Sequence, residues 1–132
     1  MLHVGWDSDH SMNPSSKPED VVQAQLAFYN TRDLEGIMST YAEGAQQFEF
    51  PSTLLANGAS EIRERLSVRF KEPNLHARLN HRIVAGNRII DHETVTRTFP
   101  DGTGTIELVA IYEVQDGRIA KAWFISGRKT LD

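Results

Sequence analysis

The sequence has no cysteine, and this absence excludes disulfide bonds, thiolate metal sites and cysteine nucleophiles. It also has no apolar run near the roughly 18 residues that a membrane-spanning helix needs. A basic excess is missing too, because the formal net charge is -4, so nucleic acid and anionic membrane surfaces are poor candidate partners. A small neutral or weakly charged ligand fits this balance better.

Several nucleotide-binding and hydrolase motifs are missing as well. The chain has no Gly-x-Gly-x-x-Gly, no phosphate-binding loop, no Gly-x-Ser-x-Gly elbow and no His-Glu-x-x-His. We therefore expect no cofactor. The N-terminus lacks the charged and apolar regions of a signal peptide, so the cytoplasm is the expected location.

What is present is typical of one globular domain. The 132 residues are 39% hydrophobic and 24% charged, and a chain of this length can bury about two-thirds of its unfolded surface. Residues 1–17, rich in Gly, Ser, Asp and Asn, are predicted to form a flexible arm, within which Met12 is an alternative natural start. Residues 18–132 are predicted to form the domain.

Three helices are predicted in the first half of the chain, because apolar residues recur there at three- and four-residue spacing. Pro18 opens the first helix, Asp33 is the predicted N-cap of the second, and Ser60 is that of the third. Between the second and third helices, residues 46–50 are predicted to be a short extended piece and residues 51–58 a loop.

From Leu75 onward the apolar pattern changes to period two, which is typical of β-strands. Turn signals divide this part of the chain into four strands at Gly86-Asn87, Asp101-Gly102 and Asp116-Gly117. We therefore predict an antiparallel meander that follows the helices, which makes the fold class α+β.

The first hairpin has a register that can be argued from its turn. A two-residue turn pairs His81 with His92, and the same register pairs Arg82 with Asp91. A cross-strand ion pair favours solvent, so we place the face that carries the histidines inward. Alternation then directs Asp91 and Glu93 outward.

The last two predicted strands, residues 105–114 and 118–126, are apolar on both faces. One face is expected to cover the helices and a pocket, and the other is expected to form a homodimer interface. A one-residue bulge in either later hairpin would reverse its faces, so the sequence leaves open whether Glu107 or Trp123 lines the pocket.

Several segments resemble the bacterial ketosteroid isomerases and the SnoaL-like cyclases of the nuclear transport factor 2-like superfamily. The similar segments are Val21 to Asn30, Asp33 to Ile37, Tyr41 to Ala45, Phe48 to Pro51, Gly58 to Arg63, and Gly117 to Ile119 with Trp123-Phe124. The resemblance implies a cone-shaped α+β fold, in which three N-terminal helices pack on a curved, mainly antiparallel sheet that encloses a pocket. This fold hosts isomerases, dehydratases, cyclases, epoxide hydrolases and non-catalytic binders, so the resemblance specifies the fold better than the chemistry.

The resemblance also implies where catalytic residues would stand. Ketosteroid isomerases use an aspartate base together with an oxyanion hole made of a tyrosine and a protonated aspartic acid. In this sequence the tyrosine position falls on Gln25, the base position on Phe50, and the buried acid on or near Ala110. All three are replaced, so an isomerase assignment would rest on the fold alone.

His92, with His81 opposite it, is the predicted catalytic pair. Imidazole titrates near neutral pH and can move a proton during isomerisation, dehydration or cyclisation. The alternative is a structural pair in which one ring donates a hydrogen bond to the other. A catalytic zinc takes three protein ligands, and Glu49 would have to turn inward to supply the third, so no metal site is predicted.

The predicted pocket combines apolar walls with a few hydrogen-bonding groups, which is the usual form of a small-molecule site. The predicted substrate-binding residues are Gln25, Phe28, Tyr29, Tyr41, Phe50, Leu54, Leu55, Thr94, Thr96, Leu108, Ala110 and Phe124.

Two functional hypotheses from different classes follow. The first is a cofactor-independent isomerase, cyclase or dehydratase that acts on a small, hydrophobic, oxygenated compound and uses His92 for proton transfer. The second is a non-catalytic ligand-binding or dimerisation module of the same fold, which the replaced positions favour.

Overall fold

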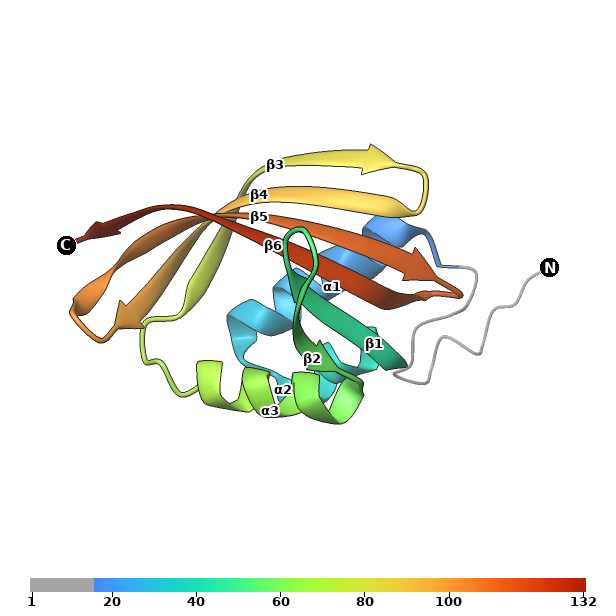
Figure 1. Cartoon of the computed structure of the whole chain (residues 1–132), viewed down its shortest axis with the longest axis horizontal. Helices are drawn as coiled ribbons and strands as arrows, with labels where there is room; N and C mark the ends of the chain where they lie inside the picture. The colour runs from blue at the N-terminus through green and yellow to red at the C-terminus, as the bar shows by residue number, and fades with distance from the viewer. Residues whose placement is uncertain (1–15) are drawn as a thin grey trace.

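The computed structural model describes residues 16–132, and Figure 1 shows three helices on one side of a six-stranded sheet. The predicted α+β class is confirmed. Residues 1–15 of the predicted arm lie outside the described part of the chain. The helices are α1 (Pro18–Thr31), α2 (Leu34–Ser39) and α3 (Ala59–Arg69). The strands are β1 (Tyr41–Glu49), β2 (Thr53–Asn57), β3 (His76–Ala85), β4 (Arg88–Phe99), β5 (Gly102–Gln115) and β6 (Arg118–Leu131).

The strands follow the order β2-β1-β6-β5-β4-β3, in which β1 is parallel to β6 and all other neighbours are antiparallel. The predicted meander from β3 to β6 is confirmed, and the sheet stays open. The loop predicted at residues 51–58 is wrong in part, because five of those residues form the edge strand β2, which pairs with β1. A strand of this length is too short to show a clear period in the sequence.

The helix starts agree with the sequence in two of three cases. Helix α1 begins at Pro18, and at α2 the Asp33 carboxylate accepts a hydrogen bond from the Gly36 N–H at 2.9 Å. The predicted Ser60 cap is wrong, because Gly58 is the N-cap of α3 and has a φ of 99°, which suits glycine. Within residues 16–132, no helix is long and apolar enough to cross a membrane.

The main core lies between the helices and the inner face of the sheet, which we define as the face that the helices cover. Burial of each large apolar side chain contributes roughly 1.5–3 kcal/mol, so this core joins the helices firmly to the sheet. Its fully buried members, from all three helices and from β4 and β6, include Val21, Val22, Ile37, Ile62, Ile89 and Ile119.

The β3–β4 hairpin has the predicted register near its turn, with His81 opposite His92. Farther from the turn, a bulge at Asn80 shifts the pairing by one residue. Leu79 therefore lies opposite Glu93, whereas an uninterrupted register would place Asn80 there.

The prediction of which face of this hairpin points inward is wrong. Asp91 and Glu93 are 0% and 4% exposed on the inner face, and His92 lies on the outer face. The ion pair lies beneath α1 instead of in solvent. Arg82 donates to both carboxylate oxygens of Asp91, at 2.7 and 2.9 Å, and to Gln23 of α1 at 3.1 Å. Because both oxygens are satisfied by charge-assisted bonds, the pair is compatible with burial.

The structure settles which face of the last two strands points inward, a question that the sequence left open. Trp123 lies on the outer face, where its ring stacks on that of Phe48 with centroids 5.8 Å apart. Glu107 also lies on the outer face, with its Oε2 atom 2.6 Å from His92 Nε2. Neither Glu107 nor Trp123 therefore lines the interior beneath the sheet.

We expect Arg82→Met to lower the free energy of unfolding by about 3–5 kcal/mol, because it leaves the Asp91 carboxylate buried without its partner. Urea unfolding followed by circular dichroism measures the change. The matched control is Arg63→Met, which removes an ion pair with Glu35 at the surface and should leave the unfolding midpoint unchanged. An Arg82→Met midpoint equal to that of the unmodified protein would contradict this role for the pair.

Candidate functional site

A cavity of about 320 Å³ lies between the helices and the inner face of the sheet. Helices α1 and α3 and all six strands contribute to its wall, so residues far apart in the sequence meet there. The lining residues are Gln25, Leu26, Tyr29, Tyr41, Gln47, Glu49, Leu55, Arg65, Leu66, Arg69, Ala77, Glu93, Val95, Arg97, Leu108, Tyr112, Phe124 and Ser126.

The cavity brings together one half of the predicted substrate-binding residues. Those that line it are Gln25, Tyr29, Tyr41, Leu55, Leu108 and Phe124. Those placed elsewhere are Phe28, Phe50, Leu54, Thr94, Thr96 and Ala110.

The positions of these six residues in the fold explain why they do not line the cavity. Phe50 and Leu54 are 46% and 49% exposed near the turn between β1 and β2, and neither lines the cavity. Phe28 packs against the main core, and Ala110 is fully buried within it. The two threonines share the outer face of β4 with His92, because the faces of this strand are opposite to those predicted.

His92 and His81 lie on the outer face of the sheet, so their predicted place in the pocket is wrong. The His92 side chain is 41% exposed, and its ring bonds to Glu107. The cause is alternation along β4: the bond to Arg82 holds Asp91 inward, which turns the next residue outward. Within residues 16–132, no three metal-binding side chains come together to form a metal site.

Glu93, which was predicted to point outward, is a titratable residue of the cavity wall. Within residues 16–132, no group donates a hydrogen bond to its carboxyl. Burial, followed by the negative charge of Asp91, raises the pKa of Glu93 to about 8, against a lowering by Arg82. The carboxyl is therefore mostly protonated at pH 7 and can donate a hydrogen bond. A signal was present in the sequence, because the same strand face carries the apolar Ile89 and Val95.

Polar groups share the cavity wall with Glu93. Gln25 Oε1 is buried and has no hydrogen-bond partner within residues 16–132. The Tyr41 hydroxyl accepts a bond from Gln47 Nε2 at 3.2 Å, and Gln47 Oε1 accepts one from Arg65 at 3.0 Å. Burial raises the pKa of Tyr41 to about 12, so this hydroxyl keeps a proton that it can donate to a ligand oxygen.

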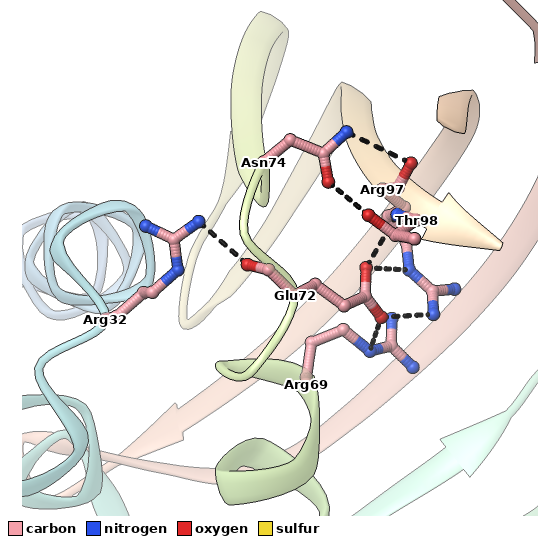
Figure 2. A network of polar contacts seen from close by, with 6 residues as sticks. All are labelled: Arg32, Arg69, Glu72, Asn74, Arg97 and Thr98. Atoms are coloured by element: carbon pink, nitrogen blue, oxygen red, sulfur yellow. Dashed lines mark hydrogen bonds and ion pairs between the residues drawn. The ribbon is translucent and has the colours of Figure 1, made fainter. Parts of the chain in front are cut away.

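A polar network around Glu72 supports the arginine side of the cavity (Figure 2). The Glu72 carboxylate accepts two bonds from Arg97, at 2.8 and 3.3 Å, and one from the Thr98 N–H at 3.0 Å. Arg69 Nε lies 3.5 Å from the same carboxylate, and Arg32 donates to the Glu72 carbonyl oxygen at 2.9 Å. Burial raises the pKa of Glu72, but the bonds from Arg97 and Thr98 outweigh this effect and lower it overall. The network thus joins the ends of α1 and α3 to β4.

We expect the free energy of unfolding to decrease as the pH rises from about 5 to about 8. The folded protein keeps the Glu93 proton up to a pKa of about 8, whereas an unfolded glutamate loses it near 4.5. Within this window the native state binds more protons than the unfolded state, so each pH unit lowers the stability by about 1.4 kcal/mol. Above the window both states are ionised, and this decrease ends.

Glu93→Gln should remove this pH dependence, because the amide has a similar shape and does not titrate. In urea unfolding the variant should match the unmodified protein near pH 5 and exceed its stability by roughly 3–5 kcal/mol at pH 8. Glu64→Gln, at an exposed site on α3, is the control and should keep the original slope. A flat stability profile for the unmodified protein between these pH values would show that Glu93 is not protonated in the fold.

Comparison with known proteins identifies a domain family. Residues 22–122 match the family model described as a SnoaL-like domain. No curated protein matches the sequence.

Solved structures share the fold at low sequence identity. The epoxide hydrolase/cyclase-like enzyme SalBIII, which has a role in pyran ring formation in the polyether salinomycin, superposes with a TM-score of 0.74 at 15% identity, covering 83% of this chain and 90% of that chain. TerC, co-crystallized with polyporic acid, has a TM-score of 0.72 at 22% identity, with 85% of this chain and 92% of that chain covered. A proposed ketosteroid isomerase from Kribbella flavida has a TM-score of 0.71 at 14% identity, with 87% and 81% covered. These similarities confirm the predicted cone-shaped fold. They do not identify a reaction, which has to be argued from the residues of the site.

Proposed function

This chain belongs to the SnoaL-like domain family, and we propose that its cavity binds a small oxygenated organic molecule and that Glu93 takes part in proton transfer on it. The fold of this family includes isomerases and cyclases. The proposed activity is that of a cofactor-independent isomerase, cyclase or dehydratase. The observation that carries this proposal is the buried, protonated carboxyl of Glu93 on the cavity wall, without a hydrogen-bond partner within residues 16–132.

Glu93 is the proposed acid. A buried neutral carboxylic acid can donate a hydrogen bond to a ligand oxygen and stabilise the negative charge that develops there. Tyr41 is a second donor on the same wall. The resemblance to ketosteroid isomerases places a buried acid near Ala110, and Ala110 pairs with Asp91 across β4 and β5. Glu93 therefore offers a carboxyl from the neighbouring strand, in place of the one missing from β5.

Glu49 is the proposed base. It lines the cavity at the end of β1, directly before Phe50, the residue at the base position of the resembling isomerases. Alternation along β1 directs Gln47 and Glu49 inward and Phe48 outward. In the proposed step the Glu49 carboxylate takes a proton from a ligand carbon, the electron pair moves to the carbonyl oxygen, and Glu93 hydrogen-bonds to that oxygen.

We expect the protein to accelerate the base-catalysed ring opening of 5-nitrobenzisoxazole, a small carbon acid whose product absorbs visible light. Glu49→Gln should lower the rate by roughly 100-fold, because it removes the base. Glu93→Gln should lower it by roughly ten-fold, because an amide is the weaker donor to the developing negative charge. Initial rates from absorbance measure both effects.

The control for this assay is Glu43→Gln, which removes an exposed carboxylate of β1 that does not line the cavity and should leave the rate unchanged. An unmodified protein no faster than an acetate buffer would count against catalysis. In that case the non-catalytic ligand-binding module becomes the better description.

We further propose that the outer face of the sheet forms a homodimer interface. Ile83 and Ile125 are 49% and 40% exposed there, on the same face as the stacked rings of Phe48 and Trp123. Ile125→Glu should convert the dimer to a monomer in sedimentation velocity, because it places an unpaired charge in the interface. Val68→Glu changes an apolar residue of α3 that is 62% exposed, and should leave the dimer intact. A monomeric unmodified protein would contradict this interface.

A further inference from the structure

The cavity wall carries an excess of positive charge, although the whole chain has a net charge of -4. Three arginines line it, namely Arg65, Arg69 and Arg97, against the carboxyl groups of Glu49 and Glu93. Because Glu93 is mostly protonated at neutral pH, the charged groups of the wall are predominantly arginines. A concave wall of this kind concentrates anions from solution.

Of the three arginines, Arg65 is the one whose positive charge is least balanced by nearby carboxylates. Within residues 16–132 it has no carboxylate partner, and it donates instead to the neutral amide oxygen of Gln47 at 3.0 Å. Burial, followed by the positive charge of Arg69, lowers the pKa of Arg65. A partly buried guanidinium without a counter-ion is unfavourable, so a negatively charged ligand group would relieve this cost.

Arg69 adds a second positive charge to the same part of the cavity wall. It lies four residues after Arg65 on α3, so both side chains project from one helix face to the cavity wall. Figure 2 shows that Glu72 is shared, because it accepts two hydrogen bonds from Arg97 and lies 3.5 Å from Arg69. The Glu72 carboxylate is therefore already used, mainly by Arg97.

The α1 side of the cavity favours a different chemical group of the ligand. Gln25 is 6% exposed, lines the cavity and has a buried Oε1 atom without a partner within residues 16–132. This oxygen can only accept a hydrogen bond, so it requires a donor such as a hydroxyl group. Two walls of the cavity thus favour different ligand groups, an anion at α3 and a hydroxyl at α1.

We propose that the natural ligand is a hydroxylated organic anion, whose charged oxygen group lies against Arg65 and Arg69 and whose hydroxyl group lies against Gln25. This inference rests on the proposed function, because it names the substrate class of the same cavity. It narrows the neutral or weakly charged ligand that the net charge of the chain favours to an anion. The reason is that net charge averages over the whole surface, whereas binding depends on the local field.

The test compares two compounds of the same shape, 6-hydroxy-2-naphthoate and 6-hydroxy-2-naphthamide, titrated into the full chain and followed by naphthalene fluorescence. We expect the naphthoate to bind at least about ten-fold more tightly, because charge-assisted bonds to arginine are stronger than neutral ones. Arg65→Gln should reduce this preference to about two-fold or less and leave the affinity for the naphthamide unchanged. Arg63→Gln is the matched control on the same helix, since Arg63 pairs with Glu35 at the surface, and it should keep the full preference.

A second measurement needs no variant and remains decisive if Arg65→Gln does not fold. Raising the salt concentration from about 0.05 to about 0.5 M should weaken naphthoate binding several-fold and naphthamide binding much less, because salt screens the charge interaction. Equal salt dependence for the two compounds would overturn the inference.

The remaining outcomes separate this inference from the proposed function. Equal affinities for the two compounds in the unmodified protein overturn the anion preference and leave the proposed function standing, because a small molecule still binds and the 5-nitrobenzisoxazole assay uses a neutral compound. A preference that survives Arg65→Gln overturns the assignment to Arg65. Failure of both compounds to bind overturns this inference and the binding part of the proposed function together.

Discussion

The buried ion pair between Arg82 and Asp91 determines which face of β4 meets the helices, and the cavity depends on that choice. Strand alternation means that a residue held inward also holds its second neighbours inward, so the position of Asp91 sets that of Glu93. The same pair influences the chemistry of the site. Burial and the charge of Asp91 keep the Glu93 carboxyl protonated, while Arg82 acts in the opposite direction.

The two ends of the cavity are supported by different polar structures. Under the N-terminal part of α1 lies the Arg82–Asp91 pair, and at the other end the Glu72 network ties α3 to β4. Helix α1 takes part in both, through Gln23 near its start and through Arg32 just after its end. The cavity wall is therefore held from both ends of one helix, which suits a site that must keep donors and acceptors in fixed positions.

The sequence predicted the α+β class, the helices and the meander but not the edge strand β2, and only half of the predicted substrate-binding residues line the cavity. Periodicity and turn residues gave the helices and the meander, because these signals are local and repeat over many residues. The orientation of β4 was missed because an arginine opposite an aspartate reads as a surface pair, whereas here Gln23 and the length of the Arg82 side chain allow it to be buried. The bulge at Asn80 leaves no recognisable signal in the sequence. Glu93 was placed on the outer face for the same reason, because strand alternation puts it on the same face as Asp91.

The unsatisfied oxygen of Gln25 has a consequence for discrimination between compounds of equal shape. Water competes with the ligand for this acceptor, and a ligand that displaces water without returning a hydrogen bond leaves a buried polar atom without a partner. Sites built in this way reject an analogue that carries a methyl where the true ligand carries a hydroxyl far more strongly than they reject one of slightly different size. The single amide of Gln25 on α1 thus lets the cavity discriminate between ligands by their functional groups as well as by their shape.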